Sequence, residues 1–286
     1  MIDMLKGTIV KIISNQYTIY AQGEFYDAKP RGKMRLKQAP VVGDIVSFEQ
    51  IEDSYRIHEI QKRRNYLLRP TIANVDQALI VTSLVDPDFS EHLLNRLIFL
   101  VSLADIEPII CITKADLCQD IDTIRSILSD YEKAGYTVVY SHPESDDAHL
   151  KSILQGKISV LCGQSGAGKS SLLNRLDPSF QLKTQAISKA LGRGKHTTRY
   201  CHLHQICDGW VADTPGFSSL DFSRFDLSNF DEKIKDFRPY LHQCKFSDCQ
   251  HINEPDCVIK EAVAQGQIHA SIYEDYKQII ETQKGK

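Results

Sequence analysis

Apolar and polar residues alternate in short runs over roughly the first 60 positions, a pattern that predicts strands rather than helices. The predicted strands cover residues 8–13, 16–20, 40–48 and 55–60. Several short strands in so little chain predict a small five-stranded barrel. We expect an OB-fold, with an SH3-like barrel as the alternative.

Basic residues follow two parts of this segment. Between the predicted strands, the stretch 29–37 is basic at alternate positions, which would place a basic stripe on one face of a strand. We favour oligonucleotide binding for this stripe over a charged mobile loop. The stretch 62–70 is interpreted as a basic, extended linker because it ends in Pro70.

A second pattern begins near residue 75, where buried strands alternate with amphipathic helices. Strands are predicted at 75–83, 108–112, 137–140 and 158–162, and helices at 91–101, 122–134 and 171–176. Ser90 is placed to cap the first of these helices. Alternating strands and helices predict an α/β domain with a parallel sheet.

The stretch from Gly163 to Ser170 has the spacing of a phosphate-binding P-loop, G-x-x-x-x-G-K-[ST], between a predicted strand and a predicted helix. Glycines let backbone N–H groups converge on phosphate oxygens, and the helix N-terminus adds partial positive charge. We expect Lys169 to reach the β- and γ-phosphates and the Ser170 hydroxyl to hold Mg²⁺.

The strand at 108–112 leads into Thr113, Lys114 and Asp116, a T-K-x-D version of the guanine-recognition motif N-K-x-D. A carboxylate accepts hydrogen bonds from N1–H and N2–H₂ of guanine, a donor pair that adenine lacks, so Asp116 argues against an ATPase. Ser141 begins a short loop suited to the guanine O6. The expected nucleotide contacts are Thr113, Lys114, Asp116, Ser141, Gly163, Gln164, Ser165, Gly166, Ala167, Gly168, Lys169, Ser170 and Ser171.

Two further stretches fit the nucleotide-sensing segments of a GTPase. Residues 191–199 are glycine-rich and basic, and Thr198, or else Thr197, is expected to complete the Mg²⁺ shell. A D-x-x-G stretch follows, in which Asp213 would bind Mg²⁺ through water and the Gly216 N–H would touch the γ-phosphate.

The residue after Gly216 is Phe217, which cannot hydrogen-bond the attacking water, so intrinsic hydrolysis should be slow. His196 is a candidate to accept from that water, with a plain loop histidine as the alternative. A binding module without turnover therefore stays open as a second functional class.

Cys244, Cys249, His251 and Cys257 lie within 14 residues, and three thiolates with one imidazole make a closed tetrahedral zinc set. We expect one structural zinc ion there, with His242 as the alternative imidazole. The other five cysteines are expected to be reduced thiols.

Charge and hydropathy limit the partners and the cellular location that we expect for this protein. The net charge is −3, yet residues 1–70 hold 12 Lys/Arg against 8 Asp/Glu, a balance of +4 that leaves −7 for the rest. This asymmetry favours a polyanionic partner for the N-terminal part, with a solvated basic surface as the alternative. No long apolar run or leader-like start is present, so we expect a cytoplasmic protein without a membrane span.

The order of the motifs is permuted, because T-K-x-D precedes the P-loop instead of following D-x-x-G. This order, together with G-Q-S-G-A-G-K-S-S, G-R-G-K-H-T-T-R, D-T-P-G-F-S-S and C-x₄-C-x-H-x₅-C, resembles the bacterial small-subunit-dependent GTPases of the RsgA (YjeQ/YloQ) type. The resemblance implies an OB-fold at 1–65, a circularly permuted GTPase at 66–220 and a zinc-binding helical domain at 221–286.

The resemblance also implies a function. It implies a GTP hydrolase that binds the 30S subunit and 16S rRNA, acts in late subunit maturation, and has its hydrolysis stimulated by the subunit. It marks His196, Lys169, Thr198 and Gly216 as catalytic, Ser170, Thr198 and Asp213 as Mg²⁺ ligands, and the Cys₃His set as zinc ligands. No dimerisation signature is present, so a monomer is expected.

Overall fold

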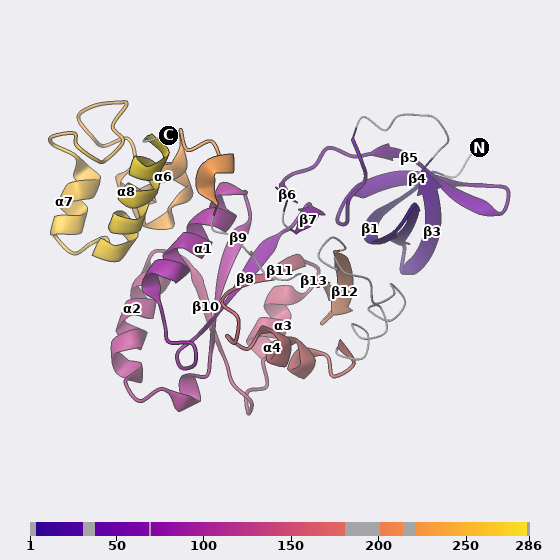
Figure 1. Ribbon diagram of the computed structural model, residues 1–286, viewed down its shortest axis with the longest axis horizontal. Helices are drawn as coiled ribbons and strands as arrows, with labels where there is room; N and C mark the ends of the chain where they lie inside the picture. The colour runs from indigo at the N-terminus through magenta and orange to yellow at the C-terminus, as the bar shows by residue number, and fades with distance from the viewer. Residues whose placement is uncertain (1–3, 31–37, 69, 181–200, 214–220, 285–286) are drawn as a thin grey trace. The chain divides into compact units, whose positions relative to one another are not determined.

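The computed structural model describes residues 4–30, 38–68, 70–180, 201–213 and 221–284, and Figure 1 draws its helices and strands. The chain divides into two compact units: residues 1–78, 146–161 and 169–218 form the first, and 79–145, 162–168 and 219–286 form the second. The three-domain division and its boundaries stay a prediction. The expected residues His196, Thr197, Thr198, Gly216 and Phe217 lie outside the described residues.

The first unit begins with the predicted β-barrel. Its strands are β1 (Leu5–Ile13), β2 (Gln16–Ala21), β3 (Glu24–Pro30), β4 (Ile45–Ile51) and β5 (Ser54–Ile60). They pair in the order β1-β2-β3-β5-β4, and β4 pairs back onto β1, so the five-stranded OB-type barrel is confirmed. Inward-facing Ile9, Ile19, Val46, Phe48 and Ile57 are fully buried and form its core.

One barrel strand differs from the sequence expectation. β3 was not predicted, because Phe25 on it is exposed and Ala28 is its only buried residue, so the alternation is weak. The expected basic stripe begins at Lys29, near the end of this strand, and its residues 31–37 lie outside the described residues.

The segment predicted as a basic linker is a short hairpin of β6 (Tyr66–Leu68) and β7 (Thr71–Ala73). Arg63 donates two hydrogen bonds to the fully buried Asp44 carboxylate, at 2.7 and 2.8 Å. A buried carboxylate requires such a partner. Part of this basic charge therefore neutralises the protein's own carboxylates.

The remaining elements of the first unit surround the P-loop strand. They are α3 (Ala148–Leu154), β11 (Ile158–Cys162), α4 (Lys169–Leu176), β12 (His202–Ile206) and β13 (Gly209–Asp213). β11 runs parallel to β13, and β12 runs antiparallel to β13. β11 matches the predicted strand residue for residue, because its Ser159–Cys162 run is buried on both faces.

The second unit contains alternating strands and helices that precede the P-loop strand in the sequence. Its elements are β8 (Gln77–Ser83), α1 (Glu91–Leu103), β9 (Glu107–Thr113), the 3₁₀ turn η1 (Ala115–Leu117), α2 (Ile121–Lys133) and β10 (Thr137–Ser141). Their strands follow the order β10-β9-β8, with β10 parallel to β9. The predicted cap is confirmed, because the Ser90 side chain accepts a hydrogen bond from the Leu93 N–H.

The C-terminal part of the second unit is helical and packs on α1 (Figure 1). It contains η2 (Phe222–Arg224), α6 (Phe230–Lys233), η3 (Lys235–Tyr240), α7 (Val258–Ala264) and α8 (Ala270–Lys284). Ile272, Tyr276, Ile279 and Ile280 form the buried face of α8. In the part of the chain that the structure describes, no helix is long and apolar enough to cross a membrane.

Candidate functional site

The phosphate-loop sequence begins at a glycine that no other residue can replace. Gly163 follows β11 with a φ of 129°, a region that L side chains rarely adopt. A Cβ added there would lie 2.0 Å from the carbonyl oxygen of Val81 on β8. At Gly163 the backbone therefore passes close to Val81 and turns at once into the loop.

Thr113, the last residue of β9, faces this loop. It is 6% exposed, and its hydroxyl donates to the carbonyl oxygen of Ala167 at 2.7 Å. A Cβ on Gly168 would lie 3.7–3.8 Å from the Thr113 side chain, which is ordinary packing distance. The first residue of T-K-x-D thus holds the phosphate loop in place.

Lys114 adopts the left-handed conformation (φ 55°), which turns the chain out of β9 and into η1. Its Nζ donates to the backbone carbonyl oxygen of Asp86. The same segment approaches the phosphate loop, where a Cβ on Gly166 would lie 3.5 Å from Pro87. Sequence reasoning missed Asp86, because a backbone carbonyl leaves no signal in residue type.

The two other base-side residues lie next to Thr113. Asp116 sits in η1 with its side chain exposed. Ser141 ends β10 and pairs directly with Thr113 across the β9–β10 ladder. The structure therefore brings T-K-x-D, the Ser141 loop and the phosphate loop to the same end of β9 and β10.

The remaining expected ligands of the phosphates and Mg²⁺ are distributed along the chain. Lys169 and Ser170 are the first residues of α4, and the exposed Ser171 follows. Asp213 is the last residue of β13. Gln164 and Ser165 lie in the loop between β11 and α4.

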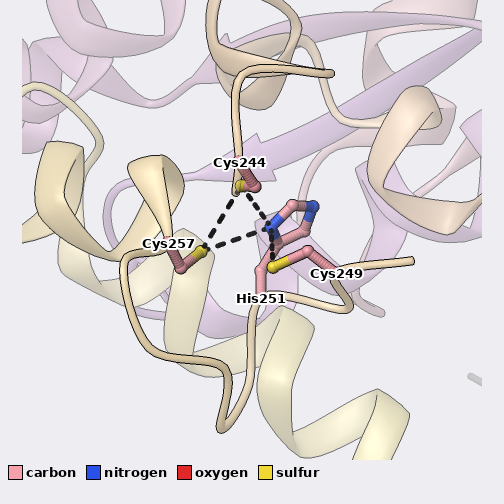
Figure 2. Close-up of side chains that lie close together, drawn as sticks. All are labelled: Cys244, Cys249, His251 and Cys257. Carbon is pink, nitrogen blue, oxygen red and sulfur yellow. Dashed lines mark hydrogen bonds between the residues drawn. The ribbon is translucent and has the colours of Figure 1, made fainter. Parts of the chain in front are cut away.

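The four predicted metal ligands converge in the C-terminal part (Figure 2). The His251 Nδ1 lies 3.6 Å from the Cys244 Sγ, 3.4 Å from the Cys249 Sγ and 3.3 Å from the Cys257 Sγ. The Sγ atoms of Cys244 and Cys257 are 3.9 Å apart. All four ligand atoms lie within 4.8 Å of one another. The alternative ligand His242 is exposed.

These separations fit a tetrahedral zinc ion. With Zn–S bonds of about 2.3 Å and a Zn–N bond of about 2.05 Å, tetrahedral geometry places sulfurs ~3.8 Å apart and nitrogen ~3.6 Å from each sulfur. The Cys244–Cys257 sulfur separation and the three nitrogen–sulfur separations agree with these values to within a few tenths of an ångström. A Cys₃His set with this geometry is consistent with a zinc site.

The electrostatics of the cluster bear on how its thiols ionise. Burial raises the pKa of the Cys249 thiol to about 12 and also raises that of Cys257. Burial opposes ionisation of Cys244 too, yet hydrogen bonds from the Val258 N–H and the neighbouring thiols lower its pKa. Ionisation of Cys249 and Cys257 is therefore unfavourable without a nearby cation, and a bound metal ion would supply that charge.

Comparison with known proteins agrees with this architecture. Residues 6–55 match the model of the RsgA N-terminal domain, and residues 60–223 match that of the RsgA GTPase. The "Small ribosomal subunit biogenesis GTPase RsgA 2" of Oceanobacillus iheyensis is 44% identical over 284 residues, covering 97% of each chain. The "Small ribosomal subunit biogenesis GTPase RsgA" of Enterococcus faecalis is 43% identical, covering 96% of this chain and 94% of its own.

Solved structures resemble the whole chain as well. The crystal structure of YloQ, described as a circularly permuted GTPase, superposes with a TM-score of 0.86 at 37% identity, covering 99% of this chain and 96% of its own. YjeQ from Thermotoga maritima superposes with a TM-score of 0.84 at 32% identity, covering 99% of both chains. The chain therefore belongs to the RsgA family of circularly permuted GTPases and is a GTP hydrolase.

Proposed function

We propose that this GTPase acts in the bacterial cytoplasm in late maturation of the small ribosomal subunit, as a monomer that binds the 30S particle and its 16S rRNA. The subunit stimulates hydrolysis, and hydrolysis times release. Full-length similarity to proteins named small ribosomal subunit biogenesis GTPases supports the pathway. The bond from Thr113 to Ala167 is the observation that carries the nucleotide site, because it joins the base motif to the phosphate loop.

Guanine selectivity in this proposal comes from Asp116. Its exposed carboxylate accepts the N1–H and N2–H₂ donors of guanine, while Ser141 and its loop support the O6 edge. The loop from Gly163 to Ser171 surrounds the phosphates, and Lys169 neutralises their charge. Ser170 and Asp213 hold Mg²⁺ when it is bound with GTP, and Mg²⁺ supplies further charge neutralisation.

The nucleotide-sensing roles fall to residues outside the described ranges. Thr198 completes the Mg²⁺ shell, the Gly216 N–H meets the γ-phosphate, and His196 accepts from the attacking water. Because Phe217 follows Gly216, the free protein lacks the water-orienting glutamine of Ras-like enzymes. A site left incomplete in this way gives the bound subunit a role in completing it.

The N-terminal barrel and the C-terminal part bind rRNA in this proposal. The barrel belongs to a fold that binds oligonucleotides, and the +4 balance of residues 1–70 suits a phosphate backbone. In the C-terminal part, one structural zinc ion held by Cys244, Cys249, His251 and Cys257 replaces a large core. This ion has no open coordination position and takes no part in hydrolysis.

The timing part of the proposal is tested by sedimentation with 30S subunits. Binding is measured with GDP and with a non-hydrolysable GTP analogue, at several salt concentrations. We expect tighter binding in the analogue state, because a nucleotide controls release only through different affinities in its two states. Equal affinity in the two states would contradict timed release.

Phe217 also favours a second candidate function, a nucleotide-gated RNA-binding module with little turnover. This module would show the same nucleotide-dependent binding to 30S subunits. It would differ in showing no stimulation of hydrolysis by the subunit.

A further inference from the structure

The two ring nitrogens of His251 face different partners. Nδ1 points at the three thiols of the metal cluster, at 3.3–3.6 Å (Figure 2). Nε2 lies 3.3 Å from the Oδ2 atom of Asp231, a residue 20 positions upstream that is not part of the ligand set. His251 itself is 3% exposed, whereas the Asp231 side chain is 24% exposed, so the contact lies at the edge of the buried cluster.

Asp231 is held firmly at this position by its neighbour. It lies on α6, where Phe230 is 1% exposed and anchors the helix. The Phe230 ring packs edge-on against Phe99 of α1, with centroids 5.3 Å apart. It also packs against Tyr276 of α8 in a tilted arrangement, with centroids 5.3 Å apart. Adjacent residues of one short helix therefore contact the GTPase core and the metal-binding histidine.

The loop that carries His251 is fixed from a second direction. The Tyr273 hydroxyl donates to the His251 carbonyl oxygen at 2.7 Å, and the Tyr276 hydroxyl donates to the Gln250 carbonyl oxygen at 3.0 Å. These bonds position the backbone of the loop. The imidazole ring itself packs edge-on against Phe237, with centroids 6.3 Å apart, and its two nitrogens face the thiols and Asp231.

We propose that Asp231 is a positioning residue of the metal centre, whose carboxylate accepts the Nε2–H of His251 and so presents the Nδ1 lone pair to the zinc ion. This inference rests on the proposed zinc occupancy of the cluster. A neutral imidazole carries one proton, and a carboxylate at one nitrogen keeps it there and leaves the other nitrogen free for metal. Outer carboxylates of this kind strengthen metal binding by about 10–100-fold.

The arrangement also links the metal centre to the rest of the second unit. Asp231 reaches His251 only while α6 is seated against α1 through Phe230. Zinc affinity therefore depends on the docking of this helix as well as on the four ligands. The metal centre is coupled to the GTPase core through Phe230 and Asp231.

The test compares Asp231→Asn with Glu232→Gln in the full-length protein. Glu232 is the exposed neighbour on the same helix, so its substitution removes the same charge without touching the ring. Zinc affinity is measured by competition with a chromophoric chelator. We expect about 10–100-fold weaker zinc binding for Asp231→Asn and wild-type affinity for Glu232→Gln. Equal affinity in the two variants would overturn the proposal.

A second variant, His251→Cys, distinguishes a role of Asp231 in orienting the imidazole from a role in stabilising the fold. His251→Cys makes a four-thiolate site that does not use the imidazole. In this background, adding Asp231→Asn is expected to leave zinc affinity unchanged, and Co²⁺ absorption reports the four-thiolate set. If Asp231→Asn weakens zinc equally with and without His251, or unfolds both backgrounds, Asp231 acts through the fold and the proposal fails.

Failure of the zinc assignment has its own signature. Wild-type protein that retains no zinc, and shows no cobalt–thiolate absorption when reconstituted with Co²⁺, would overturn the occupancy and the role of Asp231 with it. Wild-type protein that holds one zinc with the same affinity as Asp231→Asn would overturn the role of Asp231 alone.

Discussion

The hydroxyl of Thr113 donates a hydrogen bond to the carbonyl oxygen of Ala167 at 2.7 Å, and Ala167 is fully buried. This bond joins the strand that ends in T-K-x-D to the loop that has the P-loop sequence. Thr113 stands where the related motif has asparagine. In the structure its hydroxyl contacts the loop that has the P-loop sequence.

Thr113→Val tests this assignment, because valine keeps the shape and removes the hydroxyl. It leaves a buried carbonyl oxygen without this donor, which costs about 1–2 kcal/mol, or ~5–30-fold in affinity. We expect GTP and GDP to weaken alike and tripolyphosphate to weaken with them, while guanosine binding is unchanged. These affinities are measured by displacing a fluorescent nucleotide with GTP, GDP, tripolyphosphate or guanosine.

Thr113→Ser is the matched control, since it keeps the hydroxyl and should bind nucleotides nearly as the wild type does. Loss of guanosine binding in Thr113→Val, with tripolyphosphate unaffected, would place Thr113 on the base instead of the phosphate loop.

Asp116→Asn tests guanine recognition. An amide cannot accept from both N1–H and N2–H₂ of guanine, but its NH₂ can donate to the C2 carbonyl of xanthine. We therefore expect GTP affinity to fall by at least ~100-fold and XTP affinity to rise. Asp122→Asn, at an exposed carboxylate on α2, removes the same charge and should change neither. Unchanged GTP affinity in Asp116→Asn would refute the assignment.

Cys257→Ser tests the zinc centre, because a serine hydroxyl does not replace a thiolate. Loss of one of four ligands should remove roughly a quarter of the ~10–16 kcal/mol of a structural zinc site, or about 3 kcal/mol. Zinc content and Tm measured together should both fall. Cys118→Ser removes a thiol outside the cluster and should change neither. A zinc-replete Cys257→Ser protein would contradict the ligand set.

Asp236 makes the second unit sensitive to pH. Burial raises the pKa of its carboxyl to about 6, against a hydrogen bond from Tyr136 that lowers it. Its Oδ2 is enclosed without a hydrogen-bond partner among the described residues. The folded state therefore holds this proton up to a higher pH than the unfolded state does. Stability is lost as pH rises from about 4 to about 6.

Asp236→Asn should remove the free-energy cost of ionising a buried carboxyl, while the amide oxygen of the new side chain still accepts a hydrogen bond from Tyr136. We expect the free energy of unfolding at pH 7 to rise by on the order of 2–3 kcal/mol relative to wild type, with no gain at pH 4. Urea unfolding across this pH range measures the difference. Asp248→Asn, at an exposed site, is the control. A gain that does not depend on pH would show that the carboxyl does not titrate in this range.

Local pattern predicted much of this molecule. The P-loop strand and the Ser90 cap follow from residue order alone, because each depends on neighbours a few positions away. The Cys₃His cluster could also be predicted from the sequence, because its four residues lie within 14 positions of one another.

Contacts between distant segments were not predictable in the same way. The Arg63 and Asp44 pair, the Thr113 bond to Ala167 and the contact between Asp231 and His251 join positions 19, 54 and 20 residues apart. Each contact depends on which strands and helices are neighbours in the tertiary structure, and the local sequence pattern does not specify those neighbours. β3 was missed because its exposed Phe25 hides the alternation that marks a half-buried strand.

The central claim is that the small subunit completes the hydrolytic site of this GTPase. The measurement is GTP hydrolysis by the purified protein alone, with salt-washed 30S subunits, and with 50S subunits as control, using Lys169→Ala for background. We predict strong stimulation by 30S subunits only. Confirmed GTP binding without stimulation by 30S subunits would contradict the account and favour a nucleotide-gated RNA-binding module.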